Sequence, residues 1–295
     1  MKKIKLMTVI CGLALIVASC SNDDDDAPSK SNLTLNISGL EDLGEDYAYE
    51  GWIMVNGSPK SAGIFTVNGN GELSTSSFEI DSGDLAIATA YILTIEPSPD
   101  TDPAPSDVHI LAGDFSGNSA SITVDHGAAI GTDFTAATGK YILATHTDGG
   151  SMSDELSGVW WLDPTAGPGA GLDLPTLPAG WKYEGWAVID GTPVTTGTFT
   201  SATGMDDFDG FSGMMAGPAF PGEDFLMNAP SGLTFPTDLS GGTVVISVEP
   251  SPDNSAAPFL LKPLVGMVPA GAADHTPYDM GNNASATNPS GTVTR

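Results

Sequence analysis

Two glutamates recur at matched positions and are the first candidates for chemistry. Glu50 recurs as Glu184 inside the string Tyr-Glu-Gly-Trp, and Glu96 recurs as Glu249 at the start of Glu-Pro-Ser-Pro-Asp. Two carboxylates facing each other across one cleft can hydrolyse a glycosidic bond, and one alone can hold a ligand. Nothing in the sequence places Glu50 opposite Glu96, so we expect no enzyme. We expect Glu96 and Glu249 to accept hydrogen bonds from loop N–H groups, and Glu50 and Glu184 to lie on a solvated strand face.

Metal-binding patterns are weak along the chain. Four histidines are scattered, without the short spacings of a zinc site, and we expect them at the surface: His109, His126, His146 and His275. Asp206, Asp207 and Asp209 bring several carboxylate oxygens close together in the sequence, and such hard ligands suit calcium. The loop pattern and the terminal glutamate of an EF-hand are absent. Asp100 and Asp102 are weaker candidates. We therefore expect an acidic loop at 206–210, no metal site and no cofactor.

Tryptophans divide into two groups. Trp52 and Trp186 recur at matched strand positions, so we expect both in the core. Trp160 and Trp161 are adjacent, and neighbouring strand residues point to opposite faces, so at least one is expected to face away from its own core. That side chain would line a seam between the copies, or stack on a sugar ring or a partner. Three apolar residues are expected to bury against the neighbouring copy, with an exposed apolar patch as the alternative: Met214, Met215 and Phe220.

Charge and cysteine content exclude several functions. The 295 residues include 9 basic and 37 acidic ones, for a net charge of −28, which repels nucleic acid and anionic membrane surfaces. Cys11 and Cys20 are the two cysteines, so no disulfide framework, thiolate metal site or cysteine nucleophile exists after position 20.

The first residues predict a lipoprotein signal peptide. Three lysines precede the 12-residue stretch Leu6–Val17, which is too short to span a bilayer because spanning takes about 20 residues. Val17-Ala18-Ser19-Cys20 resembles the bacterial lipobox, which implies cleavage before Cys20 and acylation of Cys20. The acyl chains, such as palmitate, would anchor the protein in the outer membrane of a Gram-negative cell. An ordinary secretory signal is the alternative.

Four aspartates follow the lipidation site. Asp23–Asp26 resembles the acidic export signal that accompanies display of lipoproteins on the outer face of the outer membrane in one Gram-negative phylum. A solvated acidic linker is the alternative, because clustered like charges stay extended. We therefore expect a lipid-anchored protein on the cell surface.

The rest of the chain contains an internal repeat. The string at 49–52 recurs at 183–186, an offset of 134, and the string at 95–100 recurs at 248–253, an offset of 153. The change of offset implies about 19 extra residues in the second copy, within 201–242. Two landmarks in the same order indicate duplication.

Strand patterns predict an all-β fold. Leu33, Leu35 and Ile37 alternate with polar residues, and similar segments, separated by Gly, Pro, Asn and Asp, follow at 47–55, 63–67, 73–80, 91–95, 108–111, 119–124 and 141–145. The pattern near 84–89 allows one short turn of helix, and a first strand of the second copy is expected at 158–162. We expect two tandem β-sandwich, immunoglobulin-like modules. The expected division is a signal peptide at 1–19, an acidic tether at 20–31, copy one at 32–150 and copy two at 151–295.

The repeated strings resemble a known domain. Tyr49-x-x-Trp52, the Pro59-x-x-x-Gly63-x-Phe65 hairpin and the Thr-Ile-Glu-Pro strand end at 94–97 are similar to the extracytoplasmic C-terminal domain of anti-sigma-K factors. The resemblance covers 47–113 and recurs in copy two, and it implies a β module outside the cytoplasm. The helical sigma-binding domain and the membrane helix of those factors have no counterpart in this sequence. We expect a non-enzymatic binding or sensory module for another envelope protein, with a surface glycan-binding or adhesive lipoprotein as the alternative.

Overall fold

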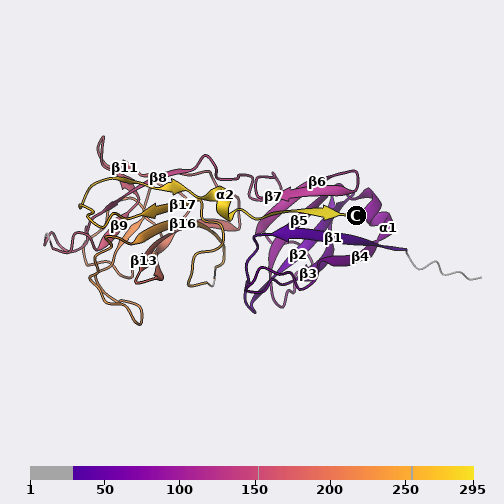
Figure 1. Ribbon diagram of the computed structural model, residues 1–295, viewed down its shortest axis with the longest axis horizontal. Helices are drawn as coiled ribbons and strands as arrows, with labels where there is room; N and C mark the ends of the chain where they lie inside the picture. The colour runs from indigo at the N-terminus through magenta and orange to yellow at the C-terminus, as the bar shows by residue number, and fades with distance from the viewer. Residues whose placement is uncertain (1–28, 152, 254) are drawn as a thin grey trace, which may run out of the picture.

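The computed structural model describes residues 29–295, apart from 152 and 254. Two β-rich bodies lie end to end along the long axis of the molecule (Figure 1). Their sheets are antiparallel, and the described residues form two short helices, α1 (Ser82–Ile87) and α2 (Ala284–Thr287). The all-β prediction is therefore confirmed. Within the described part of the chain, no helix has the length and apolar character needed to cross a membrane.

The predicted signal peptide, Cys20 and most of the predicted tether lie outside the described residues.

The first sheet contains eight strands in the order β3-β2-β5-β6-β7-β20-β1-β4. Their bounds are β1 (Lys30–Ser38), β2 (Tyr47–Val55), β3 (Ser58–Phe65), β4 (Ser77–Asp81), β5 (Ala90–Pro97), β6 (His109–Ser116), β7 (Ser119–Thr123) and β20 (Ser290–Thr294). The two edge strands approach each other, because the rings of Phe65 in β3 and Phe78 in β4 have centroids 6.4 Å apart. The sheet therefore curls around a core.

The second body is built from two five-stranded sheets and a two-stranded ribbon. One sheet has the order β14-β13-β16-β17-β19, with bounds β13 (Trp181–Ile189), β14 (Thr192–Phe199), β16 (Thr243–Pro250), β17 (Leu264–Met267) and β19 (Gly281–Asn282). The other includes β8 (Thr138–Leu143), β9 (Gly158–Trp160), β12 (Leu172–Asp173), β15 (Gly222–Asp224) and β18 (Tyr278–Asp279). The ribbon pairs β10 (Leu162–Asp163) with β11 (Gly169–Ala170). Trp161 Nε1 donates to Thr196 Oγ1 at 3.3 Å and so links β14 to the layer that contains β9.

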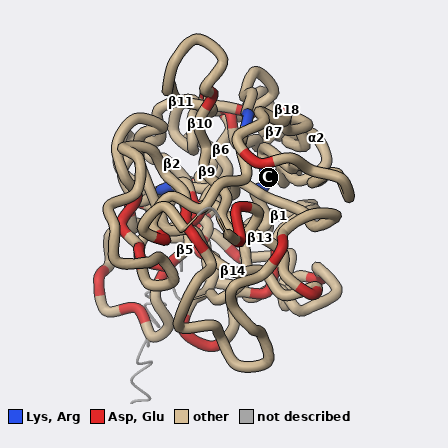
Figure 2. The backbone as a smooth tube through the Cα atoms, turned by 90° about the vertical axis from the view of Figure 1, so that its left-hand side faces the viewer, with Lys and Arg blue, Asp and Glu red and all other residues tan. Residues whose placement is uncertain are grey.

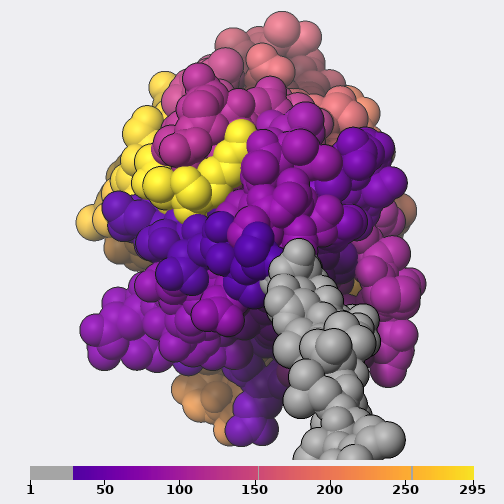
Figure 3. All heavy atoms as spheres, turned by 90° about the vertical axis from the view of Figure 1, so that its right-hand side faces the viewer, coloured from indigo at the N-terminus to yellow at the C-terminus, as the bar shows by residue number. Residues whose placement is uncertain are grey.

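Strand pairing crosses the expected division at residue 150. β8, expected in copy one, pairs with β9 and β12 of the second body. β20, expected in copy two, lies between β1 and β7 of the first sheet, with Val293 opposite both Leu35 and Ala120. Figure 3 shows the yellow C-terminal residues beside indigo β1 on this end of the molecule. Each body therefore includes a strand from the far side of the expected boundary.

Local sequence explains the clearest elements. In β1, Leu33, Leu35 and Ile37 are buried while their neighbours are exposed, as the alternation predicted. Helix α1 begins after Asp81, whose Oδ1 accepts hydrogen bonds from the N–H groups of Gly83 and Asp84. The strand expected over 73–80 is shorter, because regular pairing begins only at β4.

One apolar core runs through both bodies. The largest cluster of buried side chains includes Leu33 and Ile110 from the first sheet and Trp161 and Val248 from the second body. The offsets of 134 and 153 residues define a first repeat (47–113) and a second repeat (181–266). Buried side chains of both repeats belong to this core.

Candidate functional site

The repeated glutamates Glu96 and Glu249 fix the ends of β5 and β16, as predicted. Glu96 accepts hydrogen bonds from the Ser106 N–H at 2.9 Å and from the Thr94 hydroxyl. Glu249 accepts them from the Phe259 N–H at 2.9 Å and from the Ser247 hydroxyl. Each carboxylate therefore ties the proline-rich loop that follows its strand back to the sheet.

Glu50 and Glu184 are buried, which corrects the expected solvated strand face. Only 5% of Glu50 and 6% of Glu184 is exposed. Each accepts a hydrogen bond from a hydroxyl on the neighbouring hairpin strand, Ser61 in β3 and Thr195 in β14. Burial raises the pKa of Glu50, and it raises the pKa of Glu184 to about 7. The sequence pattern failed because a strand between two others in a curled or covered sheet has no solvated face.

The repeated tryptophans occupy the core, as predicted. Trp52 Nε1 donates to Thr94 Oγ1 at 2.9 Å, and Trp186 Nε1 donates to Ser247 Oγ at 2.8 Å. The same two hydroxyls donate onward to the glutamates at the strand ends. An indole, a hydroxyl and a carboxylate thus form one buried chain of hydrogen bonds in each repeat.

The glycine before each tryptophan makes space for an aromatic side chain. A Cβ on Gly51 would lie 2.2 Å from Tyr91 Oη, and a Cβ on Gly185 would lie 2.5 Å from Trp161 Nε1. The β2–β3 and β13–β14 pairings also shift register at these glycines. Both repeats therefore use a β-bulge at the same position to fit a ring against the backbone.

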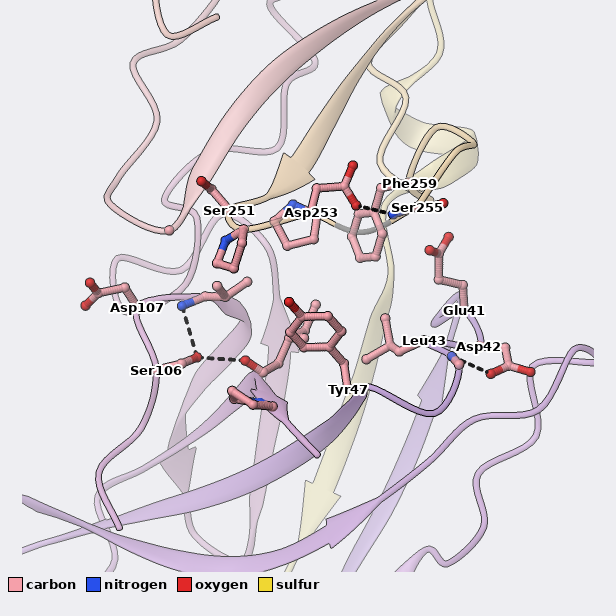
Figure 4. Close-up of a pocket in the computed structure, with 17 residues that line it drawn as sticks. Glu41, Asp42, Leu43, Tyr47, Ser106, Asp107, Ser251, Asp253, Ser255 and Phe259 are labelled. Carbon is pink, nitrogen blue, oxygen red and sulfur yellow. Dashed lines mark hydrogen bonds between the residues drawn. The ribbon is translucent and has the colours of Figure 1, made fainter. Parts of the chain in front are cut away.

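A cleft of about 520 Å³ lies where the two repeats meet (Figure 4). The backbones approach closely at its edge, because a Cβ on Gly180 would lie 2.5 Å from the Asp107 carbonyl oxygen. Pro97 and Pro250, which occupy equivalent positions in the two repeats, both line it. The cleft is therefore formed by the same strand end of each repeat.

The interior of this junction cleft is apolar and its edge is acidic. Figure 4 shows the Tyr47 ring between loops of the two repeats, and Ile95, Val108 and Phe259 also line the cleft. Four carboxyl groups lie among the lining residues: Glu41, Asp42, Asp107 and Asp253. No lysine or arginine is among them. An apolar cleft with a few converging polar groups is the usual form of a binding site.

Glu41 connects the cleft to the second body. Burial raises the pKa of Glu41 to about 7, against the opposing effects of the Lys262 ammonium and of a hydrogen bond from the Leu260 backbone. Its own carbonyl oxygen accepts a hydrogen bond from the Tyr49 hydroxyl at 3.1 Å. The matched Tyr183 hydroxyl donates to Pro175 O at 2.7 Å, so the second repeat has the same corner without the carboxyl group. Sequence reasoning missed Glu41 because it does not recur.

Trp160 and Trp161 are both buried, with exposed fractions of 4% and 0%. Trp161 joins the main core, and Trp160 packs in a small cluster with Ile142, Ala144 and Leu162 while its Nε1 donates to Asp224 Oδ1 at 2.8 Å. Asp224 also accepts hydrogen bonds from the backbone and hydroxyl of Thr147. The insertion packs over Trp160, with Gly217 against its ring, and leaves only its edge in the wall of a second pocket of about 400 Å³.

The insertion exposes methionines, contrary to the expected burial. Met214 is 96% exposed and Met215 is 59% exposed, while Phe220 packs against the Trp160 cluster. The insertion derives its order instead from contacts among four aromatic rings: Phe208, Phe211, Phe225 and Phe235. The aromatic rings fill the interior of the insertion, so Met214 and Met215 remain exposed on its surface.

The acidic loop at 206–210 is held by internal contacts. Asp206 accepts hydrogen bonds from the N–H groups of Gly222 and Phe208, and burial raises its pKa to about 6. Asp207 accepts from Thr198 and pairs with Lys182 at 3.0 Å. The Asp206, Asp207 and Asp209 carboxylates do not form one of the convergent clusters found among the described residues.

Two other clusters bring three ligand atoms within 4.8 Å of one another in the described part of the chain. One consists of Glu155, Asp274 and His275, of which the last two are exposed, and the ring of His146 lies 5.6 Å from that of His275. The other consists of Glu184, Glu249 and Asp253. The spacing of the histidines gave no sign of the first cluster, whereas Asp253 could have been found because it recurs as Asp100.

Comparison with protein-family models, with curated proteins and with solved structures found no match to this chain. Function is therefore inferred from the geometry of the described residues and from the sequence patterns.

Proposed function

We propose that this protein is a non-enzymatic cell-envelope lipoprotein that binds a segment of another envelope protein in the junction cleft. The bound segment carries a basic residue beside apolar side chains. The single observation that supports this most strongly is the cleft itself, with Tyr47, Val108 and Phe259 inside and carboxylates around it. Apolar contacts supply affinity, and the carboxylates select for positive charge.

Electrostatics across the molecule favour the same class of partner. The chain carries a net charge of −28, and acidic positions far outnumber basic ones along the backbone in Figure 2. A potential of one sign accelerates the encounter with an oppositely charged segment, in a manner that salt weakens. The resemblance to the extracytoplasmic domain of anti-sigma-K factors supports a partner in the envelope. The lipobox ending at Cys20 supports an outer-membrane anchor, and Asp23–Asp26 supports display at the cell surface.

The glycan-binding alternative rests on the acidic tether after Cys20 and on a tryptophan that faces away from its own core. Trp161 has no exposed surface and Trp160 is 4% exposed at the wall of a second pocket, so neither offers an open ring face to a sugar, and the second ground is weakened. Catalysis by the repeated glutamates has little support as well, because neither Glu184 nor Glu249 lines the junction cleft.

Site-specific photocrosslinking in cells tests the proposal. A photoreactive residue at Leu43, which lines the cleft, is compared with one at Ile64, which is 54% exposed on edge strand β3. We expect one discrete protein adduct from position 43 and none from position 64. Asp42→Asn and Asp107→Asn together should weaken the adduct, and so should high salt, because both reduce the attraction of a basic segment.

Peptide arrays provide the matched measurement on purified protein. Peptides with alternating apolar and basic residues should bind, and the same peptides with glutamate in place of each basic residue should not. Equal binding of both series, or an adduct pattern that is identical at positions 43 and 64, would refute the proposed cleft.

A further inference from the structure

Three carboxylates converge at the end of β16 in the second repeat. One ligand oxygen from each of Glu184, Glu249 and Asp253 lies within 4.8 Å of the other two. Glu184 is opposite Ser247 in the β13–β16 register, so Glu249, two residues further on, is its diagonal neighbour on the same face. Asp253 comes from the proline-rich loop that follows and is exposed. The cluster therefore extends from the buried sheet to solvent.

One oxygen of this cluster has no protein partner. Glu249 has no exposed surface, and its Oε1 accepts hydrogen bonds from the Ser247 hydroxyl and the Phe259 N–H. Its Oε2 is buried and accepts none. A buried, unsatisfied carboxylate oxygen is costly, and two further carboxylates beside it add repulsion. Burial, together with the nearby Asp253 and Glu184, raises the pKa of Glu249 to about 8.

The first repeat provides an internal comparison. Glu50, Glu96 and Asp100 occupy the equivalent positions there. Both oxygens of Glu96 accept from the Ser106 N–H, at 2.9 and 3.2 Å. The three residues of the first repeat are not among the clusters whose ligand atoms converge within 4.8 Å. The same sequence pattern thus yields a satisfied carboxylate in one repeat and an open one in the other.

We propose that Glu184, Glu249 and Asp253 bind a divalent cation, with Ca²⁺ as the preferred ion. Three hard oxygen ligands suit Ca²⁺, and oxygens bound to one ion at 2.3–2.6 Å lie at most about 5 Å apart, which these atoms satisfy. Zinc is disfavoured because the cluster offers neither nitrogen nor sulfur ligands. Water on the exposed side of Asp253 completes the coordination shell.

The bound ion connects the proline-rich loop to the sheet. Asp253 lines the junction cleft, whereas Glu184 and Glu249 do not. An ion shared by all three fixes the position of the loop that carries Asp253. Asp253 belongs to both the cleft and the cation site. Calcium binding is measured without a cleft ligand, and crosslinking at position 43 does not depend on calcium affinity, so the failure of one proposal can be told from the failure of the other.

Calorimetric titration and thermal unfolding with CaCl2 test the site on the full purified protein after treatment with a chelator. We expect a dissociation constant of about 10⁻⁴–10⁻³ M, the range of extracytoplasmic calcium modules, and a melting temperature that rises with calcium concentration. Asp253→Asn should weaken binding by about tenfold or more, because ligand charge sets affinity. This exposed substitution leaves the folded core intact, and Glu249→Gln should also abolish the calcium response.

Two matched variants locate the ion. Asp100→Asn, at the equivalent position of the first repeat, and Asp209→Asn, in the acidic loop, should both bind calcium like the parent protein. Loss of binding in either one, or an unchanged response in Asp253→Asn, overturns the assignment. A melting temperature that depends on pH but not on millimolar calcium also overturns it, since Glu184 and Glu249 would then share a proton instead of an ion.

Discussion

Trp186 Nε1 donates a 2.8 Å hydrogen bond to Ser247 Oγ, and the Ser247 hydroxyl donates onward to the Glu249 carboxylate. The equivalent chain in the first repeat runs from Trp52 through Thr94 to the strand-end glutamate. Thr94 in the first repeat and Ser247 in the second serve equally well, because only the hydroxyl takes part. The tryptophan of each repeat therefore contributes to the core and, through one hydroxyl, to the position of the loop that borders the cleft.

Replacing Trp52 with alanine should destabilise the protein strongly. Trp52 is 3% exposed and packs against Ile92, Ala112 and Ala129. The cavity and lost burial should cost about 3–5 kcal/mol in the free energy of unfolding. Urea unfolding measures this cost, and Ile64→Ala, on an exposed site, should change stability by no more than about 0.5 kcal/mol. Equal stability of the two variants would show that Trp52 is not a core residue.

A single methyl group should be poorly tolerated at Gly51. The Cβ of Gly51→Ala would lie 2.2 Å from Tyr91 Oη, and we expect a loss of about 1–3 kcal/mol. Tyr91 Oη is buried without a hydrogen-bond partner, so Tyr91→Phe alone should be neutral or stabilising. In combination, Tyr91→Phe should recover part of the loss. Gly69→Ala, where nothing lies within 4 Å, is the control, and a double variant with no recovery would contradict the packing.

Sequence patterns identified these repeated positions because each combines a recurring residue type with a strand period. Leu33, Trp52 and Glu96 followed from pattern alone. Burial of Glu50 did not, because period two cannot show whether a strand has neighbours and cover on both faces. The junction cleft could not be predicted either, since it depends on how two strand ends 153 residues apart in the chain meet.

Stability should fall as the pH rises from about 5 to 8. Burial raises the pKa of Glu249 to about 8 and that of Glu184 to about 7, from an ordinary value of 4.5. Glu223, in β15, has no exposed surface, and burial raises its pKa to about 7 as well. Between these limits the folded state binds more protons than the unfolded chain, so deprotonation favours unfolding. Their contribution is complete below about pH 4.5 and is lost as the pH passes the folded values.

Urea midpoints at pH 5, 6, 7 and 8, recorded with a calcium chelator present, measure this slope. Glu249→Gln should flatten the profile, and Glu79→Gln, at an exposed position of β4, should leave it unchanged. Stability that increases over the whole interval would contradict the buried environment of these glutamates.

Cys20→Ala should abolish membrane attachment. The proposal places the lipid anchor at Cys20, and several acyl chains on one residue hold a protein far more firmly than one chain does. The variant should leave the outer-membrane fraction, and protease added to intact cells should digest the parent protein if it is displayed outside. A Cys20→Ala variant that stays in the membrane fraction would refute the anchor, and protection until lysis would place the protein in the periplasm.

A separate peptide with the sequence of strand β20 should be able to take its place in the first sheet. Strand β20 fills the space between β1 and β7, and Val293 on it is completely buried. Arg295, which follows, donates to Ala88 O at 2.6 Å and lies 4.3 Å from the Phe115 ring centroid. Deleting 290–295 should leave β1 and β7 with unpaired edges and lower the melting temperature, because exposed edges lose both hydrogen bonds and burial.

A synthetic peptide of residues 288–295 should restore the melting temperature of the truncated protein by strand addition. The same peptide with Val293→Asp should fail, because the carboxylate would enter an apolar core without a partner. Rescue by both peptides would indicate that backbone pairing alone is sufficient. An unchanged melting temperature after the deletion would show that β20 does not hold the first sheet together.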